Sequence, residues 1–217
     1  MIIAGIDPSI NGTGVFKFFL DDKLQVQKVS HLGFTQVKKY SCESIIHYKK
    51  TNFYNYIEQN KFMYDHLSSF LDDVSYVAME DYAFAATGRV YHIGEFVGGL
   101  KILLYDSGKM LRMYEPTVLK KFATGKGNSD KVSMCDAYNT IAAASSGLLD
   151  LPSLKEYASP KTDLVDAYYA TKLLNLELLL RYGFVSLNNL SQTDISIFNR
   201  CTKSNPVNIL ARDFLNK

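Results

Sequence analysis

Four acidic side chains stand where a solvated carboxylate is not expected. Asp7 ends the apolar run at the N-terminus, and Glu80 interrupts a second apolar run in the middle of the chain. Asp163 and Asp166 are spaced i, i+3 at the start of a helical pattern, so they share one helix face. Buried carboxylates need a counter-charge, and two Mg²⁺ ions about 3.5–4 Å apart would provide it. The four acids therefore suggest a two-metal carboxylate site.

Each acid also has an ordinary structural explanation. Asp7 stands before Pro8 and Ser9, as in an Asx turn; Asp163 would favour the helix dipole; and Glu80 would pair with a lysine. These ordinary roles explain each acid taken singly better than they explain all four together. Most of the four acids interrupt or adjoin apolar segments, where a solvated carboxylate is not expected. We expect Asp7 and Glu80 to meet if their strands are neighbours, with Asp7 bridging the two ions from a rigid strand end.

The stretch 120-KKFATGKGNSDK-131 is basic, with Lys120, Lys121, Lys126 and Lys131 against a single acid. It lacks the Gly-Lys-Ser/Thr ending of a Walker loop and the GxGxxG spacing, so no nucleotide cofactor is indicated. Its glycines allow a nucleic acid backbone to come close, and its lysines would bind phosphates. The alternative is a solvated charged loop between two helices.

A second candidate contact follows Glu80 along the chain. Tyr82 and Phe84 lie in a short segment that ends just before Arg89. Aromatic rings stack on bases and arginine binds phosphates, so we expect these three residues to contact DNA. The alternative for Arg89 is that it merely begins the next helix.

The elements that must position these residues form an α/β pattern. Three strand patterns are joined by short turns, and two further strands alternate with helices, which is typical of a mixed sheet. We therefore predict a mixed five-stranded sheet flanked by helices. The strands are expected at 2–7, 14–20, 24–34, 76–84 and 109–116, and the longer helices at 52–72, 89–105 and 162–183.

Composition limits the class of protein. The chain has 217 residues, 47% of them hydrophobic, which suffices for one substantial core. It has neither an apolar run of about 18 residues nor a signal peptide, so we expect a cytoplasmic protein without a membrane partner. Its three cysteines lack the spacing of a zinc site or a disulfide framework. Because the net charge is only +2, any nucleic-acid-binding surface must be local.

Four stretches together resemble the signature regions of RuvC-like Holliday junction resolvases, in particular those encoded by bacteriophages. They are 5-GIDPSINGTGV-15, 77-VAMEDYAF-84, 118-VLKKFATGKGNSDK-131 and 162-TDLVDAYYA-170, in matching order and spacing. The first stretch alone would also fit sugar-kinase and actin-like ATPases, whereas all four together favour the resolvases. The resemblance covers residues 1 to about 175.

This resemblance implies an RNase H-like fold, a homodimer, and Mg²⁺-dependent hydrolysis of phosphodiester bonds at four-way DNA junctions, with Mn²⁺ able to replace Mg²⁺. A phage-encoded protein would act in the cytoplasm of its bacterial host. The family's metal-binding acids and phosphate-binding bases match Asp7, Glu80, Asp163, Asp166, Lys120 and Lys131, and Lys131 is counted as catalytic with the acids. The family's junction-opening aromatic would fall at Ala83, between Tyr82 and Phe84, so that role is not assigned.

We expect residues 1–183 to form the nuclease domain and residues 184–217 a C-terminal extension for dimer or DNA contact, with a helical stretch at 206–217. Two other functions fit parts of the pattern. A catalytically inactive junction-binding protein would not need all four acids. An actin-like ATPase or kinase would need a second phosphate loop and an adenosine-binding glycine motif, which the sequence lacks. The favoured prediction is a structure-selective endonuclease that nicks branched DNA symmetrically.

Overall fold

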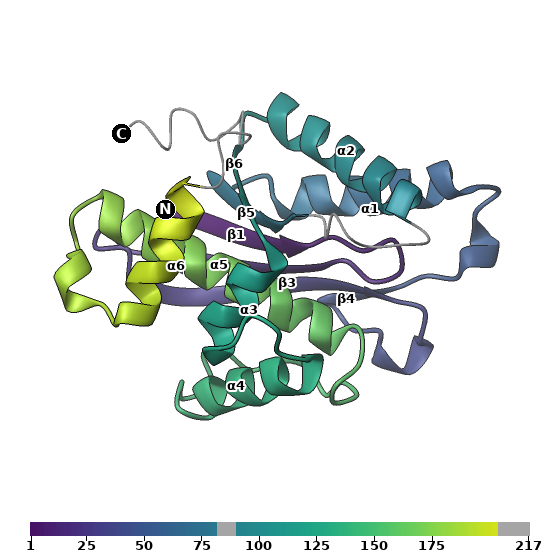
Figure 1. The fold of residues 1–217 in the computed structure, drawn as a ribbon. Coiled ribbons are helices and arrows are strands. Elements are labelled where there is room, and N and C mark those ends of the chain that lie inside the picture. The colour runs from purple at the N-terminus through teal and green to yellow at the C-terminus, as the bar shows by residue number, and fades with distance from the viewer. Residues whose placement is uncertain (82–89, 204–217) are drawn as a thin grey trace.

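The fold is built on one mixed sheet of six strands in the order β4-β3-β2-β1-β5-β6 (Figure 1). The computed structural model describes residues 1–81 and 90–203. The strands are β1 (Ile2–Asp7), β2 (Gly14–Leu20), β3 (Val26–Thr35), β4 (Ile45–His47), β5 (Tyr76–Glu80) and β6 (Met110–Tyr114). The α-helices are α1 (Tyr56–Phe70), α2 (Val90–Asp106), α3 (Pro116–Thr124), α4 (Lys131–Ala143), α5 (Lys161–Arg181) and α6 (Gln192–Lys203).

The strands pair as an antiparallel meander extended by parallel strands. β1, β2 and β3 are antiparallel neighbours, whereas β5 pairs in parallel with β1 and β6 pairs in parallel with β5. Helix α1 precedes β5 and helix α2 connects β5 to β6, as parallel pairing requires a crossover. The predicted α/β fold with a mixed sheet flanked by helices is confirmed.

The number of strands differs from the prediction. We predicted five strands, and the sheet has six because β4 pairs in parallel with the end of β3. β4 is only three residues long and lies in a mostly polar segment. A strand this short leaves no alternation of apolar and polar residues to detect in the sequence.

The sheet separates two apolar layers. On one face, Ile3, Phe16 and Ala78 pack against residues of α5 and the helices beside it. On the other face, Ile6 and Val77 pack against α1 and α2. Figure 1 shows α1 and α2 over one face and α3, α4 and α5 over the other. Among the described residues, no helix combines the length and the apolar character needed to cross a membrane.

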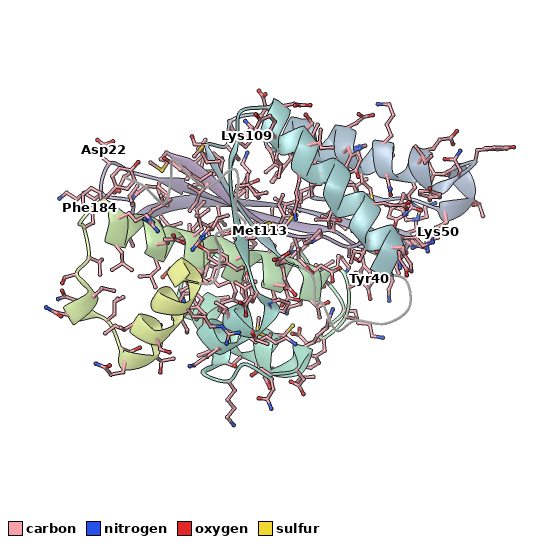
Figure 2. The ribbon with its side chains drawn as sticks, turned by 45° about the horizontal axis from the view of Figure 1, so that its top comes forward. Asp22, Tyr40, Lys50, Lys109, Met113 and Phe184 are labelled. Carbon is pink, nitrogen blue, oxygen red and sulfur yellow. The ribbon has the colours of Figure 1, made fainter. Side chains whose placement is uncertain are left out.

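The two ends of the sheet carry different parts of the chain. The turn between β2 and β3 contains Asp22, and Figure 2 shows this residue on the left side of the molecule. Lys50, from the segment between β4 and α1, lies on the opposite side in the same view. Since Asp7 pairs with Gly14 at the start of β2, β1 ends away from the Asp22 turn.

Helix α5 lies directly on the backbone of β1 and β2. A Cβ atom added at Gly14 would meet the backbone of Asp163 and lie 2.8 Å from the Leu164 nitrogen. A Cβ atom added at Gly5 would lie 2.6 Å from the Thr171 nitrogen. Both distances are shorter than real Cβ contacts, so glycine is required where the helix crosses these strands.

A buried ion pair joins β6 to the same helix. The Nε atom of Arg112 donates to Glu177 Oε2 at 2.9 Å, and the Tyr114 hydroxyl donates to the same oxygen at 2.9 Å. Both Arg112 and Glu177 are buried, and Arg181 donates to the second carboxylate oxygen of Glu177. The paired charges compensate each other's loss of hydration. β6, and α3 which follows it, are therefore anchored to α5.

The described part of the C-terminal extension packs on the domain. Ile197 of α6 is buried in the same apolar cluster as residues of α5. Arg200 of α6 forms an ion pair with Glu115, the residue that precedes α3. The helical stretch predicted at 206–217 lies outside the described residues, and the domain boundary at 183 stays a prediction.

We expect Gly14→Ala to destabilise the protein by about 1–3 kcal/mol, because the added methyl group pushes α5 away from β2. The measurement is the free energy of unfolding in urea. Gly98→Ala is the matched control, since nothing lies within 4 Å of a Cβ atom at Gly98 in α2. There the change should be neutral or stabilising, by up to about 1 kcal/mol. Equal tolerance of both substitutions would contradict the direct contact.

Candidate active site

Four carboxylates meet in one cavity at the end of the sheet where β1 stops. The cavity has a volume of about 250 Å³. It also contains two lysines, one serine and two apolar side chains. The lining residues are Asp7, Ser9, Glu80, Leu119, Lys120, Lys131, Met134, Asp163 and Asp166.

The sheet brings Asp7 and Glu80 together. β1 and β5 are parallel neighbours, with Ile6 paired to Met79, so both carboxyl ends reach the same edge. Successive side chains in a strand alternate between faces. Asp7 therefore shares the face of Ile3, and Glu80 shares the face of Ala78, which is the face covered by α5.

Helix α5 begins over this edge and supplies the other two acids. Asp163 lies in its first turn, and Asp166 follows one turn later on the same side. The contact between Gly14 and the backbone of Asp163 holds the start of the helix against β2. Three elements distant in sequence thus direct four carboxylates into one space.

Burial and mutual repulsion raise the pKa values of these carboxyls. Burial raises the pKa of Asp7 well above its usual value, and the other three carboxylates raise it further. Burial, followed by the charge of Asp166, raises the pKa of Glu80 to about 7. Burial also raises the pKa of Asp166 to about 6, against the opposing effect of Lys131. Burial is the largest cause in each case, so these carboxyls are harder to ionise than free ones, and a bound cation would favour their charged form.

Asp163 is the most firmly held of the four carboxylates. The Ser159 hydroxyl donates to Asp163 Oδ2, and the Thr162 hydroxyl donates to Oδ1 at 3.2 Å. Lys131 Nζ lies 3.8 Å from Oδ1. Burial raises the pKa of Asp163, while these partners lower it. Ser159 has no role in the sequence analysis, because its contact depends on the turn that precedes α5.

The turn between α3 and α4 brings two lysines to the cavity. Gly125 ends α3 in a left-handed conformation, and the side chain of Asp130 caps α4 by accepting from the Ser133 amide at 2.8 Å. Lys131 then starts α4, and Lys120 comes from the last turns of α3. Burial acts to lower the pKa of Lys131, but the four carboxylates outweigh it and raise that pKa.

The other predicted DNA contacts divide into two groups. Lys121 and Lys126 lie outside the cavity lining, and Lys126 is exposed. Helix geometry explains the difference between Lys120 and Lys121, since adjacent residues point about 100° apart on a helix of 3.6 residues per turn. Tyr82, Phe84 and Arg89 fall outside the described residues.

The cavity residues fit a hard divalent cation. Their donors are carboxylate oxygens, which Mg²⁺ prefers, and four acids face only two lysines. Within residues 1–81 and 90–203, no three His, Cys, Asp or Glu side chains converge as a formed metal site. The four carboxylates line the cavity without converging on a single point, as expected for like charges that repel each other.

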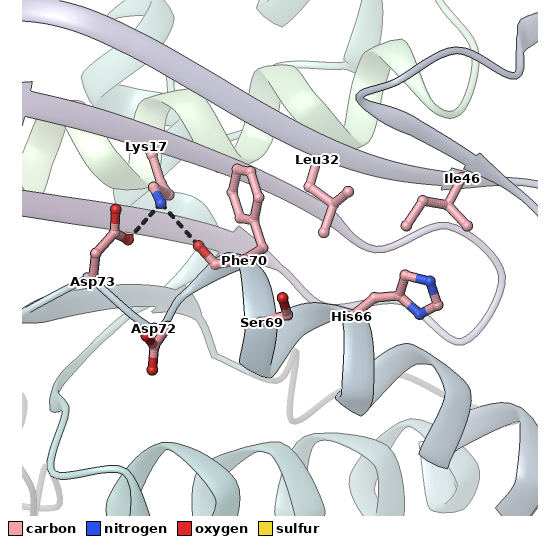
Figure 3. Close-up of a pocket in the computed structure, with 8 residues that line it drawn as sticks. All are labelled: Lys17, Leu32, Ile46, His66, Ser69, Phe70, Asp72 and Asp73. Carbon is pink, nitrogen blue, oxygen red and sulfur yellow. Dashed lines mark hydrogen bonds and ion pairs between the residues drawn. The ribbon is translucent and has the colours of Figure 1, made fainter.

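A different cavity, of about 500 Å³, lies between the sheet and the end of α1 (Figure 3). The buried lysine Lys17 reaches it from β2 and donates to Asp73 at 2.6 Å and to the Phe70 carbonyl at 2.9 Å. Lys17 also lies 4.6 Å from the centre of the Phe70 ring. Its lining pairs Lys17 with Asp73 and leaves Asp72 as a further acid, so this cavity gathers fewer carboxylates than the site at Asp7.

Comparison with known proteins bears on the fold. No family model and no curated protein matches the chain. The Thermus thermophilus RuvC structure is similar at 22% identity and a TM-score of 0.55, over 84% of this chain and 97% of that chain. The chain has a RuvC-like fold. T. thermophilus RuvC in complex with Holliday junction substrate matches this RuvC-like fold at 20% identity and a TM-score of 0.55, over 84% and 96%.

A more distant match is the fowlpox virus Holliday junction resolvase, at 14% identity and a TM-score of 0.48, over 81% of this chain and 99% of that chain. The RuvC-like fold confirms the predicted RNase H-like architecture. The bacteriophage type suggested by the sequence motifs stays a prediction.

The raised pKa of Glu80 predicts how stability depends on pH. Between its ordinary value of 4.5 and its folded value of about 7, the folded state holds a proton that the unfolded state has lost. The Glu80 contribution to the free energy of unfolding therefore falls as the pH rises through this range. In EDTA at pH 8, we expect Glu80→Gln to raise the melting temperature by about 2–4 °C for each kcal/mol gained in the free energy of unfolding. At pH 4 the substitution should have little effect.

Addition of Mg²⁺ separates metal binding from simple removal of a charge. At pH 8, Mg²⁺ should raise the melting temperature of the wild type more than that of Glu80→Gln. Asp65→Asn, at an exposed acid of α1, is the control and should respond like the wild type. Equal stabilisation of wild type and Glu80→Gln by Mg²⁺ would contradict a metal site at Glu80.

Proposed function

We propose that this protein is a Holliday junction resolvase, a metal-dependent endonuclease that nicks branched DNA symmetrically. The observation that carries the proposal is the cavity in which Asp7, Glu80, Asp163 and Asp166 meet two lysines. Support comes from the RuvC-like fold, since T. thermophilus RuvC was solved in complex with Holliday junction substrate.

In this proposal the four carboxylates hold two Mg²⁺ ions, with Mn²⁺ as a substitute. Divalent cations at such a site, when bound, lower the pKa of the attacking water and neutralise charge on the leaving oxygen. Asp7 would help to hold the ions from the rigid end of a central strand of the sheet. Ser159 and Thr162 orient Asp163 by hydrogen bonding to its two oxygens.

The lysines and apolar residues of the cavity have separate proposed roles. Lys131 and Lys120 bind phosphates near the scissile bond, where the carboxylates alone would repel DNA. Lys131 is catalytic in this proposal, because its ammonium group lies 3.8 Å from Asp163 and would contact a phosphate held at the carboxylates. Leu119 and Met134 line the same cavity and limit its water content.

Further DNA contacts and the assembly complete the proposal. Lys121 and Lys126 bind the DNA backbone beyond the cavity. Tyr82, Phe84 and Arg89, which follow Glu80 in the sequence, are proposed as further DNA contacts. Two symmetric nicks need two active sites, so we propose a homodimer in which each protomer cuts one strand. Such a protein acts on DNA in the cytoplasm, and in the host's cytoplasm if a phage encodes it.

The decisive experiment is cleavage of a labelled synthetic four-way junction beside matched duplex, flap and fork DNA, with Mg²⁺ and with EDTA. We expect symmetric nicking of the junction in Mg²⁺ and none in EDTA. Glu80→Gln and Asp166→Asn should each lower the cleavage rate by roughly 100- to 1,000-fold while junction binding survives. Asp65→Asn, the exposed control on α1, should cut normally. Junction binding without cleavage by the folded wild type would favour an inactive junction-binding protein.

Lys126, in the turn between α3 and α4, and Lys131, the first residue of α4, should show different defects when replaced. Lys131→Ala should lower the maximal cleavage rate by roughly 10- to 100-fold, because Lys131 lines the cavity. Lys126→Ala should chiefly raise the junction concentration needed for half-maximal rate, since Lys126 is exposed outside the cavity. The measurement is single-turnover cleavage over a series of enzyme concentrations. The same defect in both variants would contradict their separate roles.

A further inference from the structure

An exposed basic surface lies in the segment between β3 and α1, to which the sequence motifs assign no function. The segment from residue 36 to 55 contains four lysines and one acid, an excess of three positive charges in a chain whose net charge is +2. All four lysines are exposed. We call this surface the basic ledge and define it by Lys38, Lys39, Lys49 and Lys50.

The basic ledge is anchored to the sheet. β4 pairs with β3 between the two lysine pairs, and the Tyr48 amide donates to the Thr35 carbonyl at 2.9 Å. The Tyr48 ring is buried, with its centre 6.1 Å from that of Phe53 and 6.3 Å from that of Phe62. Lys49 and Lys50 directly follow this buried ring, so their backbone is held in place.

The same anchor ties the basic ledge to the loop that follows Asp7. The Tyr48 hydroxyl donates to the Asn11 carbonyl at 3.0 Å and to the Ile10 carbonyl at 3.3 Å. The side chain of Gln59, at the start of α1, donates to the Ile10 carbonyl at 2.7 Å. The segment that carries the lysines therefore contacts the loop between Asp7 and β2, at the end of the sheet that holds the carboxylate cavity.

We propose that the basic ledge binds the phosphate backbone of a duplex arm of the DNA substrate. The proposal rests on the proposed function, since it adds a binding surface to the same active site. Exposed lysines on a fixed backbone neutralise phosphates and release counterions, which contributes affinity without reading sequence. DNA whose scissile phosphate enters the carboxylate cavity must extend beyond it, and the basic ledge lies at that end of the molecule.

The chain offers a matched control at the far end of the sheet. Lys23 and Lys28 are exposed and flank the other end of the β2–β3 hairpin. Figure 2 labels Asp22, beside Lys23 in sequence, on one side of the molecule and Lys50 on the opposite side. Removing two charges at either end changes the net charge equally, so only local DNA contact distinguishes the variants.

The experiment compares Lys49→Gln/Lys50→Gln and Lys38→Gln/Lys39→Gln with Lys23→Gln/Lys28→Gln. Glutamine keeps most of the lysine side chain, and unchanged melting temperatures verify folding. We measure junction binding at several salt concentrations and cleavage on the same samples. Each ledge variant should weaken binding by roughly 10-fold and lower the slope of log affinity against log salt by about 2. The control should change binding less than about 2-fold.

Loss of binding in the ledge variants alone supports the proposal. Equal binding by ledge variants and control, with a wild type that binds and cuts the junction, overturns the basic ledge and leaves the proposed function intact. A wild type that neither binds nor cuts branched DNA overturns both. Ledge variants that bind normally but cut slowly also overturn the proposal, because the lysines would then act on the reaction rather than on DNA binding.

Discussion

The direct contact between α5 and the backbone of β1 and β2 determines the geometry of the candidate site. Gly5 and Gly14 leave no side chain between the helix and the strands. The helix therefore approaches the sheet more closely than ordinary side-chain packing allows. Asp163 and Asp166 then lie over the strand end that bears Asp7, rather than a side chain's length away. The packing of one helix thus joins carboxylates that are more than 150 residues apart in sequence.

This closeness has an electrostatic consequence, since it brings four like charges into a partly dehydrated space. Burial is the main cause of the raised pKa values of Asp7, Glu80 and Asp166, and repulsion from the neighbouring carboxylates raises them further. The protein offsets part of this repulsion with Lys131, whose position depends on the cap of α4, and with Lys120 from α3. The buried pair of Arg112 and Glu177 anchors β6, from which α3 continues. The helices that carry Lys120 and Lys131 are thus each held in place, α3 through β6 and α4 by its N-terminal cap.

Much of this arrangement could be predicted from the sequence, because local signals and global packing agree. The apolar run ending at Asp7 indicated a strand end, Glu80 was expected near the end of a strand over 76–84, and the i, i+3 spacing of Asp163 and Asp166 indicated one helix face. The strand with Glu80 ends at that residue in the structure. Features that depend on tertiary contact could not be predicted in the same way. β4 is too short to have a pattern, and Ser159 meets Asp163 only because of the turn before α5.

The basic stretch illustrates the same limit. Lys120 and Lys121 are adjacent and chemically identical, but only Lys120 lines the cavity. The rotation of α3 about its own axis determines which of the two lysines faces the cavity. The composition of the stretch does not reveal that rotation. The sequence likewise did not predict that the lysines between β3 and α1 lie near one another, since Lys39 and Lys49 are ten positions apart. The pairing of β4 with β3 brings both to one end of the sheet.

The packing of α6 on α3 makes the candidate site sensitive to truncation of the C-terminal extension. Ile197 fills part of the same apolar cluster that lies beneath α5, and Arg200 pairs with Glu115 at the start of α3. The helix that carries Lys120 is therefore supported from behind by residues near the end of the chain. Truncation at residue 183 would open the main core and remove the backing of a cavity wall. Substitutions at Ile197 or Arg200 would therefore reach the wall of the candidate site through α3, although both residues lie in the C-terminal extension.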